Sequence, residues 1–241
     1  MSTTLYLIAQ ILLILLTFSL VFLVLRGLNY ALSRLNYSKD RKSKLLSFVA
    51  IGLLCWLGIL ATLSYLGVFE DFQSLPPKIF IAITPTLVLI IVLLLSKSFF
   101  SVLERIPPSW LVYTQSYRII VELILWIGLI GGFVPFQMTF EGFNYDIVVG
   151  ITALMGGYTF FARGRFRKLE AFIWNIFGII LLFSIVIIAT LSTPSPLRVF
   201  MNEPANTVIA LVPFIWIPGF IVPLALALHL FSLKQIFYLK K

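Results

Sequence analysis

Cysteine, histidine and acidic residues are scarce in this chain, and each scarcity removes a class of chemistry. One cysteine, Cys55, in 241 residues rules out an intrachain disulfide and any metal site built on several cysteines. One histidine, His229, beside 9 acidic residues leaves too few ligands for a histidine-rich catalytic zinc site. The chain also lacks a Gly-x-Ser-x-Gly segment of the serine hydrolase kind. We therefore expect no metal and no cofactor, and we favour a protein that is not an enzyme.

Charge of either sign is also scarce. Only 11% of the residues are charged, against about 25% in a soluble domain, while 61% are hydrophobic and the mean hydropathy is +1.07. This composition is typical of an integral membrane protein. Long runs without a charge, such as Leu12 to Leu25 and Leu87 to Leu95, favour helices over the short alternating strands of a barrel.

Seven segments are apolar enough to be read as membrane spans, and each is followed by a short polar connection. A span needs about 20 residues, so seven of them fill a chain of 241 residues and leave no room for a soluble domain. The sequence predicts a single all-α membrane domain over residues 1–241, a bundle of seven transmembrane helices. The predicted helices are 4–25, 45–68, 79–96, 118–134, 147–161, 170–191 and 206–233.

The basic residues predict how this bundle is oriented. Of the 18 Lys and Arg residues, only Lys78 and Arg198 fall in segments that a seven-span chain with its N-terminus outside would expose externally. We therefore predict an external N-terminus and a cytoplasmic C-terminus, in a plasma membrane or a bacterial inner membrane. Because the net charge of +9 comes from short connections, we expect no nucleic-acid partner and take anionic lipid headgroups at the cytoplasmic face as the candidate partner.

One predicted span holds two opposite charges, Arg118 and Glu122, one helical turn apart. A charged side chain near the centre of a membrane helix costs about 2.5 to 3.5 kcal/mol, so each needs a partner, water or a functional role. Arg118 and Lys97 lie at similar distances from the turn at Pro107 and Pro108. Equal distances predict equal depth, which places Arg118 near the inner boundary with Glu122 one turn deeper.

Counting from the basic boundaries predicts a single intramembrane polar layer. Its members are Arg118, Glu122, Thr159, Asn175 and His229. If Glu122 meets His229, a carboxylate and an imidazole form a plausible proton relay. The alternative is a structural pair between Arg118 and Glu122, with His229 bound by another polar side chain. We expect Glu122 to be charged and paired.

The last predicted span contains three prolines at regular intervals: Pro213, Pro218 and Pro223. Each proline removes a backbone donor, which leaves the carbonyls of Ile209, Phe214 and Gly219 without their usual helical partners. Freed carbonyls that line a cavity can bind a cation or a polar substrate. A bent helix packed among its neighbours is the simpler interpretation of the same pattern.

The segment before residue 147 is rich in side-chain oxygens and predicts a second candidate site outside the membrane. Its members are Gln137, Glu141, Asn144 and Asp146. Together these oxygens suit a hard cation or an amine, although their spacing matches no calcium loop. Asn144 or Asp146 would serve equally well as the N-cap of the helix that follows.

A transporter or channel for a small solute or ion is the function that these features favour, because such proteins use intramembrane acids and broken helices. A membrane interaction or scaffold protein is the first alternative, since it needs only apolar helices and basic loops. A lipid-modifying enzyme is the second. It would bind phosphate through Arg118 and the basic segment from Arg163 to Lys168.

Overall fold

The computed structural model describes residues 2–161 and 166–238, and every regular element in these ranges is a helix. The prediction of an all-α protein is therefore confirmed. Four of the helices are long and apolar enough to cross a membrane, or five if one sharply bent pair counts as a single span. Both counts are compatible with a membrane protein.

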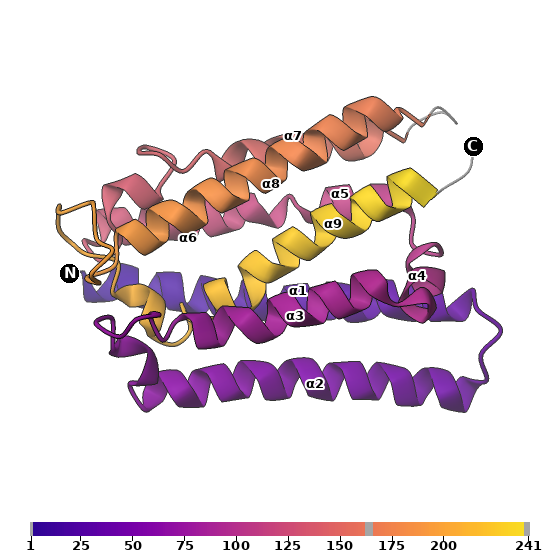
Figure 1. Ribbon diagram of the computed structural model, residues 1–241, viewed down its shortest axis with the longest axis horizontal. Helices are drawn as coiled ribbons and strands as arrows, with labels where there is room; N and C mark the ends of the chain where they lie inside the picture. Colours follow the sequence, from indigo (N-terminus) through magenta and orange to yellow (C-terminus); the bar gives the residue numbers. More distant parts are fainter. Residues whose placement is uncertain (1, 162–165, 239–241) are drawn as a thin grey trace.

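The helices lie side by side along the long axis of the molecule, with the N-terminus at the left and the C-terminus at the right of Figure 1. We call the right-hand end, where α1 finishes and α2 begins, the basic end, and the other the opposite end. The α-helices are α1 (Thr3–Ser33), α2 (Lys39–Tyr65), α3 (Phe80–Leu95), α4 (Lys97–Leu103), α5 (Pro108–Thr114), α6 (Tyr117–Ile130), α7 (Asp146–Thr159), α8 (Lys168–Leu191) and α9 (Val222–Tyr238). Short 3₁₀ turns occur at Val68–Glu70, Phe136–Met138 and Val208–Ala210.

Helices α1 and α2 extend beyond the apolar spans that the sequence predicted for them. The predicted ranges 4–25 and 45–68 become Thr3–Ser33 and Lys39–Tyr65, so most of the basic connection is helical. Ser38 explains where α2 begins, because its side chain accepts a hydrogen bond of 3.3 Å from the backbone N–H of Arg41. The apolar pattern marks where a helix can meet lipid, whereas the caps determine where it begins.

A bend of 84° separates α3 from α4. Ser96 lies at this bend, where its extended backbone ends α3 and its side chain accepts a 3.1 Å hydrogen bond from the N–H of Phe99 to begin α4. Lys97 therefore starts a helix that turns away from the span before it. The equal distances of Lys97 and Arg118 from the turn at Pro107 and Pro108 therefore do not imply equal depth, because the chain bends sharply between α3 and α4.

The predicted continuous helix 206–233 is also wrong. The chain forms a 3₁₀ turn at Val208–Ala210, an irregular stretch that includes Pro213, a π-helix at Ile217–Ile221 that includes Pro218, and only then α9. Proline disrupts a helix because it lacks an N–H and its ring clashes with the preceding turn. Pro223 is tolerated as the second residue of α9.

We call residues 208–221 the broken segment. Side chains from other parts of the bundle bind backbone carbonyls of this segment and of the start of α9. Gly219, one of the three carbonyls expected to be free, accepts a 2.9 Å hydrogen bond from the indole of Trp56 in α2. The carbonyl of Phe214 accepts one from the N–H of Ile217. Further bonds run from Ser64 to Ala210, from Gln10 to Val212, from Tyr117 to Ile221 and from Gln115 to Ala225. These contacts favour the interpretation as a packed, bent segment. They do not favour a cation site lined by free carbonyls.

The broken segment also lies at the centre of the hydrophobic core. Phe214, Ile215 and Ile221 are almost completely buried, and residues of α1 and α6, including Leu13 and Ile124, join the same cluster. By contrast, α2 buries only Leu57, Leu60 and Ser64, all in the half nearer the opposite end. The half of α2 nearer the basic end therefore packs loosely.

Replacing Tyr117 with phenylalanine tests whether these side-chain bonds support the broken segment. The buried Tyr117 hydroxyl donates a 2.8 Å hydrogen bond to the carbonyl of Ile221. Its loss leaves a buried acceptor unpaired, so Tyr117→Phe should lower the free energy of unfolding by about 1 to 2 kcal/mol in detergent. Tyr65→Phe is the control, because Tyr65 is 90% exposed and its variant should match wild type. Equal stabilities for the two variants would contradict this role.

Candidate functional site: a buried network of ionisable side chains

Arg118 of α6 forms a buried, two-pronged ion pair with Asp146, the first residue of α7. The Nε atom of Arg118 lies 2.5 Å from Oδ2 of Asp146, and its Nη2 contacts Oδ1. Arg118 is 2% exposed and Asp146 is 7% exposed, so the protein encloses both charges. Gly150 allows this approach, because a Cβ there would lie 2.9 Å from the backbone nitrogen of Ile119 in α6.

His229 of α9 continues the network from the other side of Arg118. Its Nε2 lies 3.0 Å from Nη1 of Arg118, and its Nδ1 lies 2.9 Å from Oδ1 of Asn175 in α8. A guanidinium only donates hydrogen bonds, so Nε2 must be the acceptor and the ring proton must sit on Nδ1. This arrangement requires a neutral imidazole. It donates to Asn175, whose Nδ2 in turn donates to Ser232 at 3.0 Å.

Helix α8 is shaped to accommodate this histidine. A Cβ at Gly178 would collide with the imidazole of His229, so a glycine is required where α8 and α9 meet. The ring of Trp174 lies 5.2 Å from that of His229, and the Trp174 indole donates a 3.0 Å hydrogen bond to Thr152 of α7. The network is therefore enclosed by α6, α7, α8 and α9.

Glu122 belongs to the same buried region but has a different partner. The side-chain amide of Asn144 donates to Oε1 of Glu122 at 2.5 Å and to the carbonyl of Met138 at 3.0 Å. Asn144 also accepts a 3.1 Å hydrogen bond from the backbone N–H of Asp146. The Oε2 atom of Glu122 is buried and has no hydrogen-bond partner among the described residues. One oxygen of this carboxyl group can therefore accept a further hydrogen bond or bind a proton.

The connection between α6 and α7 enters the bundle to make these contacts. Helix α7 has 14 residues, about 21 Å at 1.5 Å per residue, whereas the hydrocarbon core of a membrane is about 30 Å thick. The preceding residues Gln137, Met138, Thr139 and Asn144 are all buried. Irregular backbone in the interior is tolerated because the protein itself covers these residues.

The expected pairing of Arg118 with Glu122 was wrong, because Asp146 supplies the carboxylate. Arg118 is also too enclosed to reach the membrane boundary. Glu122 and His229 were expected to meet, but the side-chain hydrogen bonds of His229 within the described residues run to Arg118 and Asn175 instead. Thr159 is exposed near the end of α7 and lies outside the network. Arg118, Asn175 and His229 are therefore the members of the predicted layer that contact one another.

The four oxygen-bearing residues predicted as an external site are divided among separate contacts. Asn144 and Asp146 bind Glu122 and Arg118, as described above. Gln137 donates to Ser192 and accepts from Asn202, each at 2.8 Å, while Glu141 accepts a 2.7 Å hydrogen bond from Trp126. Across residues 2–161 and 166–238, no three His, Cys, Asp or Glu side chains lie together as metal ligands would.

The two basic residues at the opposite end each have an acidic partner. Lys78 lies 2.8 Å from Asp71 and Arg198 lies 2.9 Å from Glu203. The hydrogen bonds from these cations hold the pKa of Asp71 and of Glu203 below the usual values.

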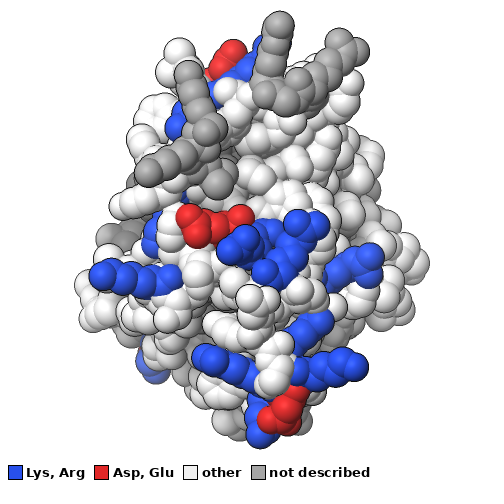
Figure 2. Space-filling view, turned by 90° about the vertical axis from the view of Figure 1, so that its right-hand side faces the viewer, with Lys and Arg blue, Asp and Glu red and all other residues white. Residues whose placement is uncertain are grey.

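Figure 2 looks at the basic end and shows Lys and Arg side chains spread over it. Part of the predicted Arg163 to Lys168 cluster, residues 163–165, lies outside the described residues.

Sequence reasoning missed Asp146 as the partner of Arg118 and missed Ser232 altogether. A usable signal existed for Ser232, since it lies three residues after His229 and so shares a helix face with it. Gly178 likewise lies three residues after Asn175. These two short patterns mark the faces on which α8 and α9 meet.

Removing one partner of the buried ion pair should be costly. Asp146→Ala leaves an unpaired guanidinium in the interior and should destabilise the protein by about 3 to 5 kcal/mol in detergent. The double variant Arg118→Met with Asp146→Ala removes both charges and should recover much of that loss. Asp71→Ala, which breaks the exposed pair with Lys78, is the control and should change the melting temperature little. A double variant as unstable as the single one would contradict the pairing.

Comparisons with known proteins place the network within a family. No curated protein and no solved structure matched the chain. The model of a family described as a domain of unknown function, DUF8737, matches residues 77–237, which include every member of the network. Because this match covers more than half of the chain, the protein belongs to the DUF8737 family.

Proposed function

We propose that this protein is a membrane transporter or channel for a small solute or ion, and that Glu122 and His229 are its proton-binding groups. The observation that carries the proposal is the burial of four ionisable side chains, Arg118, Glu122, Asp146 and His229, inside the helical bundle. Ionisable side chains within membrane segments are expensive and mark pathways for ions and protons. Glu122 suits such a role because one of its buried oxygens is unpartnered among the described residues.

The network supports a mechanism in which protonation and the ion pair are coupled. His229 can take a second proton only on Nε2, the atom that now accepts from Arg118. A protonated imidazole would place two cations 3.0 Å apart, so the guanidinium of Arg118 would have to move away. Arg118 also holds Asp146, the first residue of α7, so this movement would shift α7 against α6. Proton binding would thereby change the helix packing.

Two irregular segments support the same class of function. The connection before α7 and the broken segment before α9 both place non-helical backbone inside the bundle. Transporters use discontinuous helices of this kind near their substrate sites. The π-helix at Ile217–Ile221 is a further local irregularity of a type frequent at functional sites.

We also propose that the chain crosses the membrane seven times with its N-terminus outside. In this topology the passes are α1, α2, α3, α5 with α6, α7, α8, and the π-helix with α9. Successive passes reverse direction along the long axis in Figure 1, and the basic end faces the cytoplasm.

Reporter fusions test this orientation directly. Reporters placed after Lys44 and Lys241 should be active on the cytoplasmic side, and one placed after Asp71 should be active outside. A reporter after Lys241 that is active only outside would overturn the seven-span arrangement. The fusion after Asp71 serves as an internal control for expression and insertion.

The role of Glu122 is tested by proton flux into reconstituted vesicles. A membrane potential set with potassium and valinomycin drives protons, and an enclosed pH-sensitive dye records their entry. Glu122→Gln should fold normally and reduce the flux at least tenfold. Glu141→Gln is the matched control, because Glu141 accepts one hydrogen bond from Trp126 and lies outside the network. Glu122→Gln flux equal to that of wild type would overturn the proposed role.

A membrane scaffold is the second candidate. It is favoured by the contacts of Arg118 and Asp146, which form a closed, two-pronged pair of the kind that also fixes helix packing. This interpretation predicts that Glu122→Gln leaves cellular function intact. The lipid-modifying hypothesis loses support, because Arg118 is buried against Asp146 and is not available to a phosphate at the surface.

A further inference from the structure

A cavity of about 430 Å³ lies between α1 and α2 near the basic end. Its size falls within the range of about 300 to 1,000 Å³ typical of ligand sites. The lining residues are Phe22, Leu25, Arg26, Asn29, Leu46, Ser47 and Ala50, and we call the cavity the α1–α2 groove. None of these residues takes part in the network around Arg118.

The groove exists because α2 is bound to the bundle only along one half of its length. Leu57, Leu60 and Ser64, nearer the opposite end, are buried, and hydrogen bonds join Trp56 and Ser64 to the broken segment. Nearer the basic end α2 has no buried residue. Helix α2 is therefore attached to the bundle at one end, and an open groove remains between α1 and α2 at the other.

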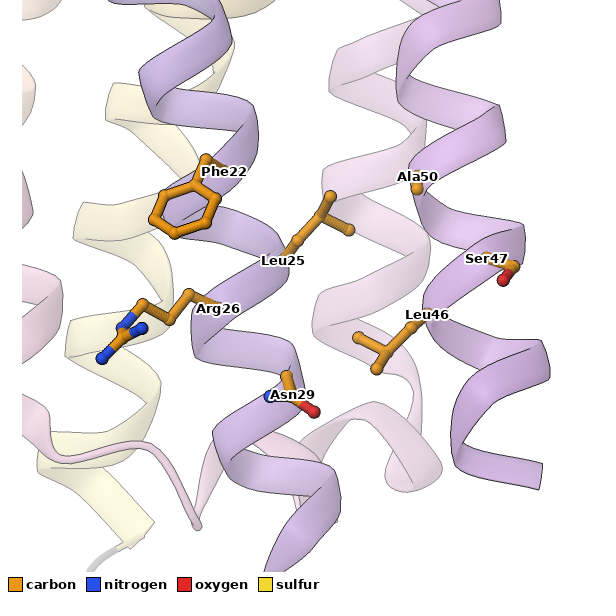
Figure 3. A pocket seen from close by; sticks show the side chains of 7 residues that line it. All are labelled: Phe22, Leu25, Arg26, Asn29, Leu46, Ser47 and Ala50. Atoms are coloured by element: carbon orange, nitrogen blue, oxygen red, sulfur yellow. The ribbon is translucent and has the colours of Figure 1, made fainter. Parts of the chain in front are cut away.

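The lining changes from apolar to polar along the groove. In Figure 3, Leu25 and Leu46 point toward one another between the helices, and Phe22 and Ala50 lie farther from the basic end. Arg26 and Asn29 follow in the direction of the basic end, and the Arg26 side chain extends from α1 away from α2 in this view. This order matches a phospholipid of the adjacent leaflet, with an acyl chain against the apolar residues and the phosphate beside the arginine.

Arg26 is the cation that lines the groove, and its side chain is free to bind such a phosphate. It is exposed, and no hydrogen bond, ion pair or ring contact holds it among the described residues. Its basic neighbours are mostly engaged. Arg34 lies over the ring of Tyr30 and Arg41 over that of Tyr37, while Lys42 donates to Ser33 and Lys44 pairs with Asp40.

We propose that the α1–α2 groove is a binding site for one anionic phospholipid of the leaflet at the basic end. Arg26 binds the phosphate, Asn29 and Ser47 offer hydrogen bonds to the headgroup, and one acyl chain lies between Leu25 and Leu46. The positive charge and the apolar floor together select a lipid over a free anion. This site does not depend on the proposed transport function.

Native mass spectrometry of the detergent-solubilised full chain tests the proposal. The probes are phosphatidylglycerol, phosphatidylcholine with the same acyl chains, and inorganic phosphate as a competitor. Wild type should bind phosphatidylglycerol in preference to phosphatidylcholine, and millimolar phosphate should leave this binding unchanged. Arg26→Gln should weaken phosphatidylglycerol binding about fivefold, as expected for one charge, and Arg26→Lys should retain most of it.

Two matched controls make the test specific. Arg34→Gln removes an equal charge from the same helix outside the groove and should change binding less than twofold. Ala50→Trp fills the groove and should abolish binding of both lipids, whereas Ile51→Trp, at an adjacent position that is 60% exposed, should not. Circular dichroism confirms that each variant is folded.

Three results would overturn the proposal. Equal losses in Arg26→Gln and Arg34→Gln would mean diffuse attraction to the basic region and no defined site. Unchanged binding in Ala50→Trp would place the lipid elsewhere. A dimer that disappears in Ala50→Trp while lipid binding persists would assign the groove to a second copy of the chain.

Discussion

The ion pair between Arg118 and Asp146 is the interaction on which the arrangement of the second half of the chain depends. A buried guanidinium needs a carboxylate, and the one that reaches it begins α7. To bring Asp146 there, the connection after α6 must enter the bundle, which in turn places Asn144 against Glu122. The same guanidinium fixes the tautomer of His229 and, through it, the contact between α8 and α9. One charge thus constrains four helices.

The cost of burying these groups explains why the network is so completely hydrogen-bonded around Arg118. An ion pair in a low-dielectric interior gains its Coulomb energy only by losing hydration, so its net contribution to stability is small and its disruption is expensive. Such pairs specify one packing over its alternatives more than they add stability. Glu122 differs from Arg118 in this respect, because its carboxyl group has an amide partner and, among residues 2–161 and 166–238, no cation bound directly to it.

Most of the long helices could be predicted from the sequence, whereas the interrupted segment before α9 and the contacts of the site could not. Long apolar runs such as those in α1 and α3 are sufficient evidence of helices, because a backbone in lipid must satisfy its own hydrogen bonds. Arg118 and Asp146 were both singled out, but the sequence assigned them to different sites. The two residues are 28 positions apart, and their pairing depends on how deeply the connection between α6 and α7 folds into the bundle. The depth predicted for Arg118 also ignored the bend at Ser96. Neither the depth of this connection nor the bend produces a recognisable pattern in the nearby sequence.

Helix α2 is attached to the rest of the protein unevenly, and this has a consequence for local unfolding. Its bonds to the broken segment, from Trp56 to Gly219, from Ser64 to Ala210 and to Leu57 from Trp216, all lie in one half of the helix. Regions with few buried contacts open at a lower free energy than the core. The backbone amides of α2 should therefore exchange their hydrogens in a gradient, fastest in the half that begins at Lys39 and slowest near Ser64. Helix α2 would then separate from the bundle at the end that begins at Lys39, while the end near Ser64 stays bound.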